Sequence, residues 1–371
     1  MADNQRMLDR FVRLCEIPSP TGEERAVADA VLAELRDLGV EAAEDSAAAA
    51  ARAAAGNLIV RIPGERDAWV MFGCHLDTVP HDGPIEAVLD QGVYRSRGET
   101  ILGADNKAAV TVLIELAARY AHGPPPIGLE ILFTVAEEDG LRGAKEVDPG
   151  SLRSPFGFVL DHASPIGEVI TAAPTYKRLV ADFEGTEAHS GIRPEDGRSA
   201  IAAAAAAIAA MRLGRLDRET TANVGVISGG TASNVVPGHC RIDGEARSLD
   251  DEQASKAIGA MVDACTWAAS EHECDVDIEL REMFRGYRLP SSAAPVRVAR
   301  AALERCGLEA REVATGGGSD ANALSAAGFE CVLLANGTEA NHTPEERVAA
   351  ERIVQMLAVC EAIVEEAAER C

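Results

Sequence analysis

The stretch IGLEILFTVAEED, residues 127–139, carries most of the information about the fold. Its first part, residues 127–134, is an almost unbroken apolar run, and the run is followed by acids at 137–139. A run of this length is typical of a strand that is buried on both faces, as in a parallel sheet. The stretch therefore predicts a core strand with Glu137 and Glu138 at its carboxyl end.

Two other apolar runs end in the same way. WVMFGCH ends at His75, and GFVLDHA carries Asp161 near its end. A helical pattern over residues 107–120 lies between them, and alternating strands and helices predict an α/β domain with a mixed, mostly parallel sheet and helices on both faces. Functional groups of such sheets gather beyond the carboxyl ends of the strands, so we expect these side chains to meet.

Residues 176–280 follow a different pattern. Runs of strand and helix character occur in the order strand, helix, strand, strand, helix, strand, which predicts an inserted ferredoxin-like βαββαβ module. The α/β pattern resumes after Pro290, and a chain of 371 residues exceeds the usual size of one core. We therefore predict one domain formed by residues 1–175 and 285–371, and a second domain formed by residues 176–284.

The segment before the first strand combines a helix with a low-complexity stretch. Thr21 and Glu24 have the spacing of a capping box, and the apolar positions that follow recur at helical intervals up to Gly39. We therefore predict a helix that begins with this box. The alanine-rich residues 47–55 predict a surface loop or an extension of the helix, and their role does not follow from the sequence.

The overall charge and composition exclude several classes of protein. The formal net charge of -25 argues against nucleic acid and anionic membranes as partners, because both require a surface rich in Lys and Arg. The N-terminal sequence lacks the apolar core of a signal peptide, and no apolar run reaches the length of about 18 residues expected of a transmembrane helix. Nine scattered cysteines without a CxxC pair predict reduced thiols in a cytoplasmic protein.

Five residues predict a metal centre when they are taken together. Some have an ordinary reading alone: HLD at 75–77 is typical of a surface pair, and Asp105 in GADNKAAV is typical of a helix N-cap. Successive acids at the end of a core strand, however, are costly to crowd without a cation. Two imidazoles and three carboxylates suit a pair of divalent ions, zinc first, with cobalt or manganese as alternatives. The predicted ligands are His75, Asp105, Glu138, Asp161 and His342.

Two further acids would support these ligands. On an extended strand His75 and Asp77 point to the same face, so the Asp77 carboxylate would hold the imidazole in one tautomer. Glu137 is left over from the ligand set, and a spare carboxylate beside the metals can act as the general base.

Eight motifs resemble, in the same order, those of peptidase T-like proteins, which belong to the zinc aminoacylase and carboxypeptidase G superfamily. The motifs are HLDTVP (75–80), GADNKAA (103–109), AEED (136–139), LD (160–161), GTEAHSG (185–191), SGGTASNVVP (228–237), GGGSDANAL (316–324) and NHTPEE (341–346). They cover nearly the whole chain, and they resemble peptidase T-like members more than acetylornithine deacetylase or succinyl-diaminopimelate desuccinylase. The resemblance implies a catalytic domain with an inserted lid.

The resemblance also implies a role for each predicted ligand. Asp105 would bridge two metals, and its bond to Asn106 corresponds to a cis peptide in relatives. The remaining ligands would form one pair for each metal: His75 with Asp161, and Glu138 with His342. Glu137 resembles the general base of the family, and Asp77 belongs with it to the catalytic residues.

Further functional residues are implied in the lid and beside it, and the lid would also join two chains as a homodimer. His189 would stabilise the oxyanion, although a surface histidine is its ordinary reading. Asn234 and Arg247 would bind the carboxylate or backbone of the substrate, and a salt bridge within the lid is an equal alternative for Arg247. Gly318 and Ser319 match a glycine-rich loop that lines the pocket.

In its function the chain resembles a cytoplasmic aminopeptidase that releases the N-terminal residue from short peptides, in the manner of a tripeptidase. The alternative enzyme is an N-acyl amino-acid amidohydrolase of the deacetylase or desuccinylase type, since both reactions break an amide with the same metals. A non-catalytic relative is a third hypothesis, but it predicts the loss of a ligand or of Glu137, and all of these residues are present. The expected substrate is a short peptide or an N-acyl amino acid.

Overall fold

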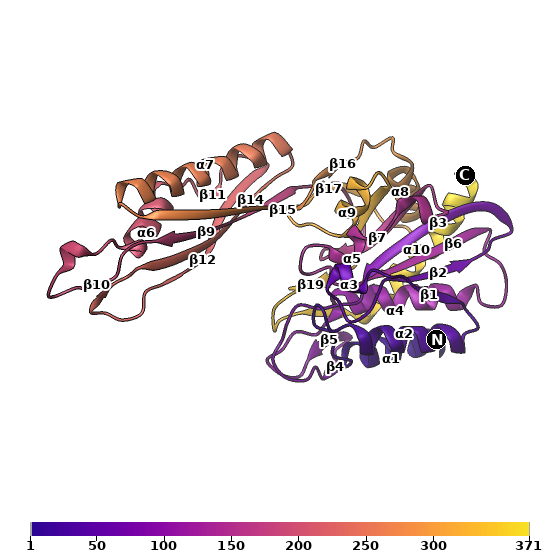
Figure 1. The fold of residues 1–371 in the computed structure, drawn as a ribbon. Coiled ribbons are helices and arrows are strands. Elements are labelled where there is room, and N and C mark those ends of the chain that lie inside the picture. The colour runs from indigo at the N-terminus through magenta and orange to yellow at the C-terminus, as the bar shows by residue number, and fades with distance from the viewer. Residues whose placement is uncertain (1, 371) are drawn as a thin grey trace. The chain divides into compact units, whose positions relative to one another are not determined.

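The computed structural model describes residues 2–370, which divide into two compact units (Figure 1). Unit 1 contains the residues up to Ala172, Arg288–Ala314 and the residues from Ser319 onward. Unit 2 contains Ala173–Tyr287 and Thr315–Gly318. The short turn 315–318 thus groups with unit 2, apart from its neighbours in the sequence.

The main sheet of unit 1 has the strand order β1-β2-β6-β3-β7-β18-β8-β16, with β17 beside β8. Its strands are β1 (Ala42–Glu44), β2 (Leu58–Ile62), β3 (Arg66–His75), β6 (Ile127–Thr134), β7 (Phe156–His162), β8 (Glu168–Ala173), β16 (Tyr287–Arg288), β17 (Arg311–Ala314) and β18 (Glu330–Ala335). The central strand β3 is parallel to β6 and β7, and β7 is parallel to β18, whereas β1 and β2 add antiparallel strands at one edge. This confirms the predicted mixed, mostly parallel sheet.

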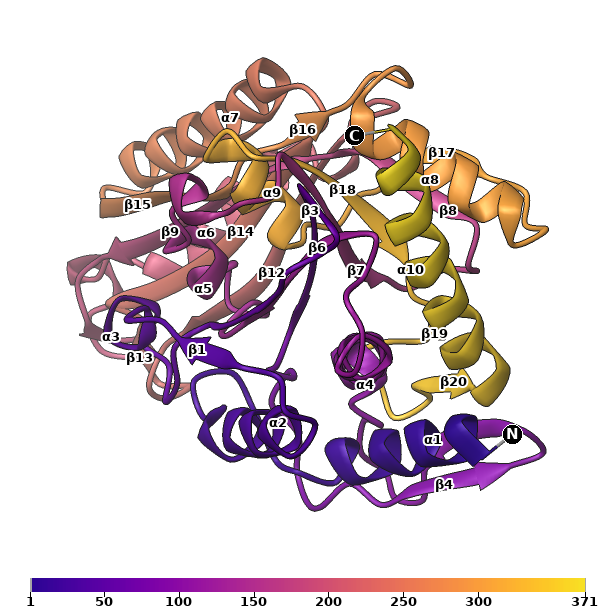
Figure 2. The same cartoon turned by 90° about the vertical axis from the view of Figure 1, so that its right-hand side faces the viewer.

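Helices cover both faces of this sheet. In Figure 2, α4, α8 and α10 lie on one side of the central strands, and α5 and α9 lie on the other. The helices of unit 1 are α1 (Ala2–Cys15), α2 (Arg25–Asp37), α3 (Ala48–Ala51), α4 (Ala104–Arg119), α5 (Arg142–Lys145), α8 (Ala294–Arg305), α9 (Asp320–Ala326) and α10 (Ala350–Arg370). A small sheet of order β19-β20-β5-β4 completes the unit, and it consists of β4 (Ala87–Asp90), β5 (Val93–Ser96), β19 (Thr338–Glu339) and β20 (Arg347–Ala349).

The position of β6 explains the unbroken apolar run that predicted it. Every residue of β6 is buried, because strands flank it on both sides and helices cover both faces. Even Glu130 is buried, and its carboxylate accepts hydrogen bonds from the backbone N–H groups of Arg153 and Ser154. A strand buried in this way has no solvent face, so its sequence does not alternate.

The predicted capping box before α2 is wrong. The helix begins at Arg25, and Glu24 at the N-cap makes no capping hydrogen bond with its side chain. Glu24 Oε1 instead accepts the N–H of Gly22 at 2.7 Å, and Thr21 Oγ1 donates to Asp77 Oδ2 at 2.8 Å. Both side chains are used in contacts outside the helix, which the local spacing did not indicate.

The alanine-rich stretch forms the separate short helix α3 between β1 and β2, so it is not an extension of α2. It is not a plain surface loop either, because Ala51 and Ala55 are fully buried in the main core. Asp45 Oδ1 accepts the N–H groups of Ala47 and Asn57, at 2.9 and 2.8 Å, and so closes the segment at both ends. Small side chains allow this close packing.

Unit 2 is built on an antiparallel sheet of order β11-β12-β14-β9-β15. Its elements are β9 (Thr175–Glu184), α6 (Ala200–Ala210), β11 (Gly214–Arg215), β12 (Thr220–Gly229), β14 (His239–Ser248), α7 (Asp251–Glu271) and β15 (Asp275–Phe284), with a separate pair β10 (Ala188–His189) and β13 (Val235–Val236). The side chain of Ser199 caps α6, and that of Asp250 caps α7. Apart from the two-residue β11, the order of elements and strands is that of the predicted ferredoxin-like βαββαβ module, which is confirmed.

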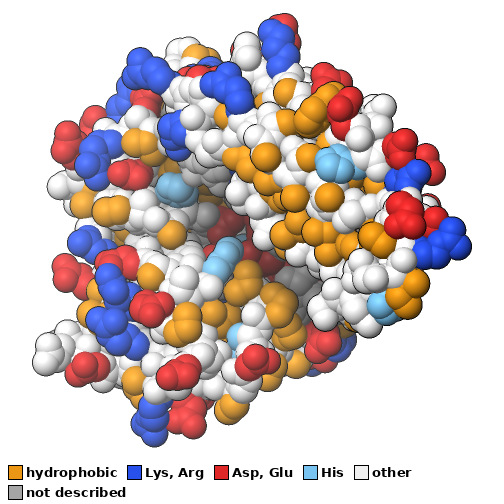
Figure 3. Space-filling model, turned by 90° about the vertical axis from the view of Figure 1, so that its left-hand side faces the viewer, with side chains coloured by type: hydrophobic (Ala, Val, Ile, Leu, Met, Phe, Trp, Pro, Cys, Tyr) orange, Lys and Arg blue, Asp and Glu red, His pale blue; other side chains and the backbone are white. Residues whose placement is uncertain are grey.

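On the face drawn in Figure 3, acidic and basic side chains lie interspersed. Within residues 2–370, no helix combines the length and the apolar composition that crossing a bilayer requires.

Candidate metal centre

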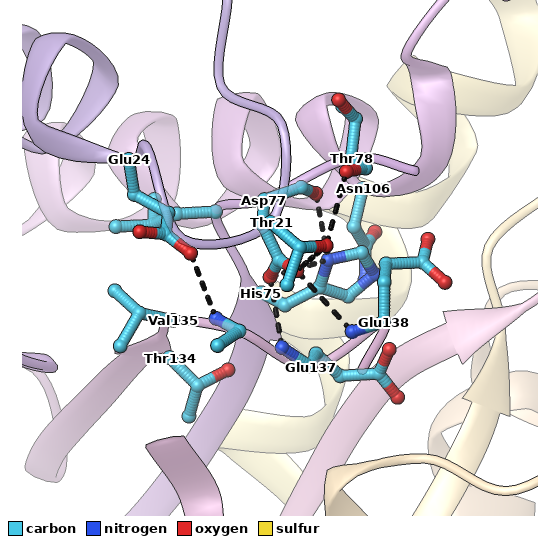
Figure 4. Close-up of polar contacts among 12 residues, drawn as sticks. Thr21, Glu24, His75, Asp77, Thr78, Asn106, Thr134, Val135, Glu137 and Glu138 are labelled. Atoms are coloured by element: carbon cyan, nitrogen blue, oxygen red, sulfur yellow. Dashed lines mark hydrogen bonds and ion pairs between the residues drawn. The ribbon is translucent and has the colours of Figure 1, made fainter. Parts of the chain in front are cut away.

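Three neighbouring parallel strands bring the predicted acids and His75 together. His75 is the last residue of β3, Asp161 lies near the end of β7, and Glu137 and Glu138 follow the end of β6. The carboxyl ends of these strands meet at one edge of the sheet, because the strands are adjacent and parallel. Figure 4 shows His75, Glu137 and Glu138 side by side at this edge.

The carboxylate of Asp105 lies between two histidines that come from distant parts of the chain. Its Oδ1 is 3.3 Å from Nε2 of His75, and its Oδ2 is 3.1 Å from Nε2 of His342. Asp105 lies in the first turn of α4, and its peptide bond to Asn106 is cis, as the resemblance implied. His342 lies in the loop between β19 and β20. One oxygen of the carboxylate therefore faces each imidazole, which is the arrangement that a bridging ligand needs.

Each histidine also has a second carboxylate beside it. Asp161 Oδ1 is 3.3 Å from Nε2 of His75, and Glu138 Oε1 is 3.0 Å from Nε2 of His342. Donor atoms around a tetrahedral zinc ion, with bonds of about 2.0–2.1 Å, are about 3.3 Å apart. Glu138 Oε1 is buried and forms no well-aligned hydrogen bond to any described residue, despite its closeness to His342. Two donors directed at a common ion have this geometry, so these residues fit a pair of divalent metals.

The pKa values of the acids and histidines in the cluster also indicate a site for cations. Burial raises the pKa of Glu138, and it raises the pKa of Asp161 to about 8. Burial opposes protonation of His75, yet the carboxylates of Asp161 and Asp105 raise its pKa well above the usual value. The contacts with Asp105 and Glu138 raise the pKa of His342 to about 10. Without metal, these acids and histidines therefore tend to bind protons, and bound divalent ions would displace those protons.

Metal binding is accordingly expected to release protons. Both histidines tend to be protonated in the metal-free chain, because the pKa of His342 is raised to about 10 and that of His75 well above its usual value, and a metal accepts only the neutral imidazole. The apparent affinity for zinc or cobalt should therefore rise as the pH is raised from about 6 to 8. Calorimetric titration in buffers of different ionisation enthalpy measures the protons released. Binding without proton release, or affinity that falls with pH, would contradict this prediction.

Asp77 connects the histidine to the acids. Nδ1 of His75 donates to the backbone carbonyl of Asp77 at 2.9 Å, which leaves Nε2 free for a metal, and the Asp77 carboxylate is 3.5 Å from the same Nδ1. That carboxylate also accepts the N–H groups of Glu137 at 3.0 Å and Glu138 at 3.2 Å (Figure 4). Asp77 therefore orients both the imidazole and the turn that carries the two glutamates.

Glu137 lies in the same cluster, and its role is open to two readings. Donor atoms of Glu137, His75 and Asp161 lie within 4.8 Å of one another, so Glu137 has the position of either a ligand or a base. Burial, followed by the charge of Asp161, raises the pKa of Glu137 well above its usual value. A raised pKa favours proton uptake, which a general base beside the metals requires.

Glu24 is a residue of the site that sequence reasoning missed. Its carboxylate is fully buried and accepts the N–H of Ala136 at 3.1 Å (Figure 4). It also accepts the N–H of Ala54 at 3.3 Å. Ala136 has a φ of 51°, an uncommon conformation for a residue with a side chain, and it directly precedes Glu137. Glu24 therefore holds the strained turn of the predicted base and joins it to the alanine-rich segment.

Two other buried charges lie around the cluster. Asp320 accepts a hydrogen bond from Thr134 Oγ1, and burial raises its pKa to about 6. Lys107 donates to Ser19 Oγ, and burial lowers its pKa to about 8. Both residues belong to motifs that carried the resemblance, GGGSDANAL and GADNKAA, and that was the only signal for them in the sequence.

The predicted residues of unit 2 lie in two places within that unit. His189 is exposed on β10, where it pairs with Val235, and its Nδ1 accepts the N–H of Gly191 at 3.2 Å. Asn234 directly precedes β13, and its backbone carbonyl accepts the N–H of Ser190 at 3.0 Å, so it lies next to the strand pair that contains His189. Their functional roles stay predictions.

Arg247 on β14 forms the salt bridge that was the alternative reading. Its guanidinium makes two hydrogen bonds to Glu245, at 3.2 and 3.0 Å, and lies 4.3 Å over the ring of Tyr176. Gly318 packs against Phe284, whose ring would lie 2.2 Å from an added Cβ. Ser319 is buried in unit 1, where it caps α9. A contact of these residues with substrate stays a prediction.

Among the described residues, two groups of side chains have donor atoms close enough together to hold an ion: His75 with Asp105 and Glu138, and His75 with Glu137 and Asp161. Neither group includes His81, His122, His162, His239 or His272.

Known proteins resemble this chain along its whole length. A model of the peptidase dimerisation domain matches residues 175–273, and a model of peptidase family M28 matches residues 57–161. The Bacillus subtilis (strain 168) protein called uncharacterized protein YqjE is 35% identical over 375 residues, which is 100% of both chains.

Two solved structures give the same result. The aminopeptidase PepT from Bacillus cereus is 37% identical, with a TM-score of 0.87 over 98% of this chain and 99% of that one. A tripeptidase from Staphylococcus aureus is 31% identical, with a TM-score of 0.92 over 99% of each chain. These likenesses confirm the family that the motifs predicted. The chain therefore belongs to the M20 metallopeptidase superfamily and, within it, to the PepT-like proteins.

Proposed function

We propose that the protein is a two-metal aminopeptidase that releases the N-terminal residue from short peptides, with tripeptides as the first substrates to try. The observation that carries this proposal is the Asp105 carboxylate, which presents one oxygen to His75 and the other to His342. The likeness to an aminopeptidase and a tripeptidase over nearly the whole chain supports the choice of substrate. We propose zinc as the metal, with cobalt or manganese as alternatives.

The chain's own residues would divide the chemistry between them. Two bound divalent ions would polarise the scissile carbonyl and make the attacking water more acidic. Glu137 would take a proton from this water as its oxygen attacks the carbonyl carbon, and would return the proton to the leaving amine nitrogen as the C–N bond breaks. Asp77 holds the backbone N–H of Glu137 and the ring of His75, so base and ligand would keep their relative position.

The substrate class is tested by comparing blocked and free peptides. With zinc, cobalt or manganese supplied, we expect kcat/KM for a free tripeptide to exceed that for its N-acetylated form by at least about tenfold, because an aminopeptidase must bind the free amine. N-acetyl and N-succinyl amino acids complete the panel. Preference for these acylated substrates would replace the aminopeptidase by an N-acyl amino-acid amidohydrolase.

We also propose a homodimer through unit 2 and a cytoplasmic location. The match of residues 175–273 to a peptidase dimerisation domain supports the dimer. Light scattering after size exclusion should give a mass of about twice the 39.0 kDa of the chain, and a monomer at micromolar concentration would contradict it. The cysteines among residues 2–370 are free, which supports a reducing compartment.

A further inference from the structure

A buried carboxylate outside the predicted ligand set holds the loop that leads into Asp105. Glu346 is 1% exposed, and its Oε2 accepts the N–H groups of Leu102 and Gly103, each at 2.8 Å. Its Oε1 accepts the N–H of Asp105, also at 2.8 Å. A single side chain therefore binds three backbone N–H groups within four residues of loop.

The same short segment holds the side chain of Asp105. His342, four residues before Glu346, lies with Nε2 at 3.1 Å from Asp105 Oδ2. The backbone of Asp105 is thus bound through Glu346 and its carboxylate through His342. Both contacts join parts of the chain more than 200 residues apart, so they form only when the C-terminal segment packs on the start of α4.

A carboxylate at this position has a cost that its hydrogen bonds must offset. It is buried beside the acidic residue Asp105, so its negative charge is disfavoured there. A neutral amide would avoid that cost, but its NH₂ group would face an N–H donor and could not accept. A carboxylate, in contrast, can accept hydrogen bonds through both of its oxygens. The loop before Asp105 is therefore held by a carboxylate in surroundings that disfavour a negative charge.

We propose that Glu346 is a positioning residue that sets Asp105 so that its two oxygens serve two metals at once. A bridging carboxylate must direct Oδ1 and Oδ2 to different ions, so a small rotation of its backbone weakens both contacts. The inference rests on the two-metal part of the proposed function and not on its substrate.

The test is metal binding by Glu346→Gln, measured without any peptide. We expect the affinity for zinc or cobalt, from competition with a chromophoric chelator, to fall by about 10–100-fold. In the peptidase assay kcat should fall and KM should change little. If the unmodified chain has no peptidase activity, the proposed function is wrong, but the metal-binding result still tests the role of Glu346.

Two controls separate positioning from general stability. Glu345→Gln removes the neighbouring charge at an exposed position, and Glu130→Gln removes a buried carboxylate that also accepts two backbone N–H groups. Neither Glu345 nor Glu130 has a hydrogen bond to a predicted ligand among the described contacts, so both variants should keep the affinity within about twofold. Equal weakening in Glu130→Gln and Glu346→Gln would overturn the proposal.

Glu346→Asp covers the case in which Glu346→Gln does not fold. It keeps the charge but is one methylene too short to reach all three N–H groups, so an intermediate affinity is expected. If Glu346→Asp melts at a lower temperature and still binds both metals with unchanged affinity, Glu346 only stabilises the fold.

Discussion

Glu137→Gln is expected to lower kcat by about 10³-fold while two metal ions per chain stay bound. The amide keeps the size of the side chain and its backbone N–H bond to Asp77, but it cannot take a proton from water. If Glu137 is the base, chemistry is lost and metal binding is kept. Activity on a tripeptide and metal content by mass spectrometry are measured on the same preparation.

The same experiment decides between the two readings of Glu137. As a ligand beside His75 and Asp161 it would contribute to binding, so the variant would lose a metal together with its activity. The matched control is Asp139→Asn, which removes a nearby exposed acid that pairs with Arg142. This control should have a kcat and a metal content close to those of the unmodified enzyme. Loss of metal in Glu137→Gln would reject the general-base assignment.

Asp105→Asn is the second change with a large expected effect. The asparagine has one acceptor oxygen in place of two, so it cannot present an oxygen to both His75 and His342. We expect at most one metal per chain and a loss of activity of about 10³-fold or more, since two-metal stabilisation of the transition state is worth several kcal/mol. Metal content and kcat/KM are the measurements.

The ordinary reading of Asp105 gives a different result. As an acid in the first turn of α4 alone, its replacement would cost only about 1 kcal/mol of stability and would leave metal binding unchanged. Asp148→Asn is a suitable comparison, because Asp148 caps a short helix and its hydrogen bonds among the described contacts go to Gly150 and Ser151 and not to a predicted ligand. An Asp105→Asn variant that keeps both metals and differs from Asp148→Asn only in its melting temperature would reject the bridging role.

Much of the fold followed from local patterns. The apolar run of β6 predicted a buried strand because a strand with neighbours on both sides and helices on both faces has no polar side. The order of elements in unit 2 likewise predicted the ferredoxin-like module. Local spacing failed at Thr21 and Glu24, where a capping box was expected, because both side chains bind groups that are far away in the sequence.

Arg247 shows where a pattern leaves a choice. The sequence allowed either a contact with substrate or a salt bridge within the lid, and the observed pair with Glu245 is two residues away on the same strand. Such residues lie on the same face of a strand, so the pair was within reach of sequence reasoning. A contact of Arg247 with the carboxylate of a substrate stays a prediction.

The types of residue in the site followed from the sequence: which residues end the core strands, that two histidines and several acids are available, and which family their motifs resemble. How these residues are held in place depends on the tertiary structure. Glu346 reaches the loop before Asp105 across 241 to 244 residues, and Glu24 reaches Ala136 across 112. Contacts of this kind leave no periodicity or spacing in the chain, because their partners are backbone N–H groups that every residue except proline carries. The sequence therefore predicted the ligands, whereas their positions depend on the packing of distant segments.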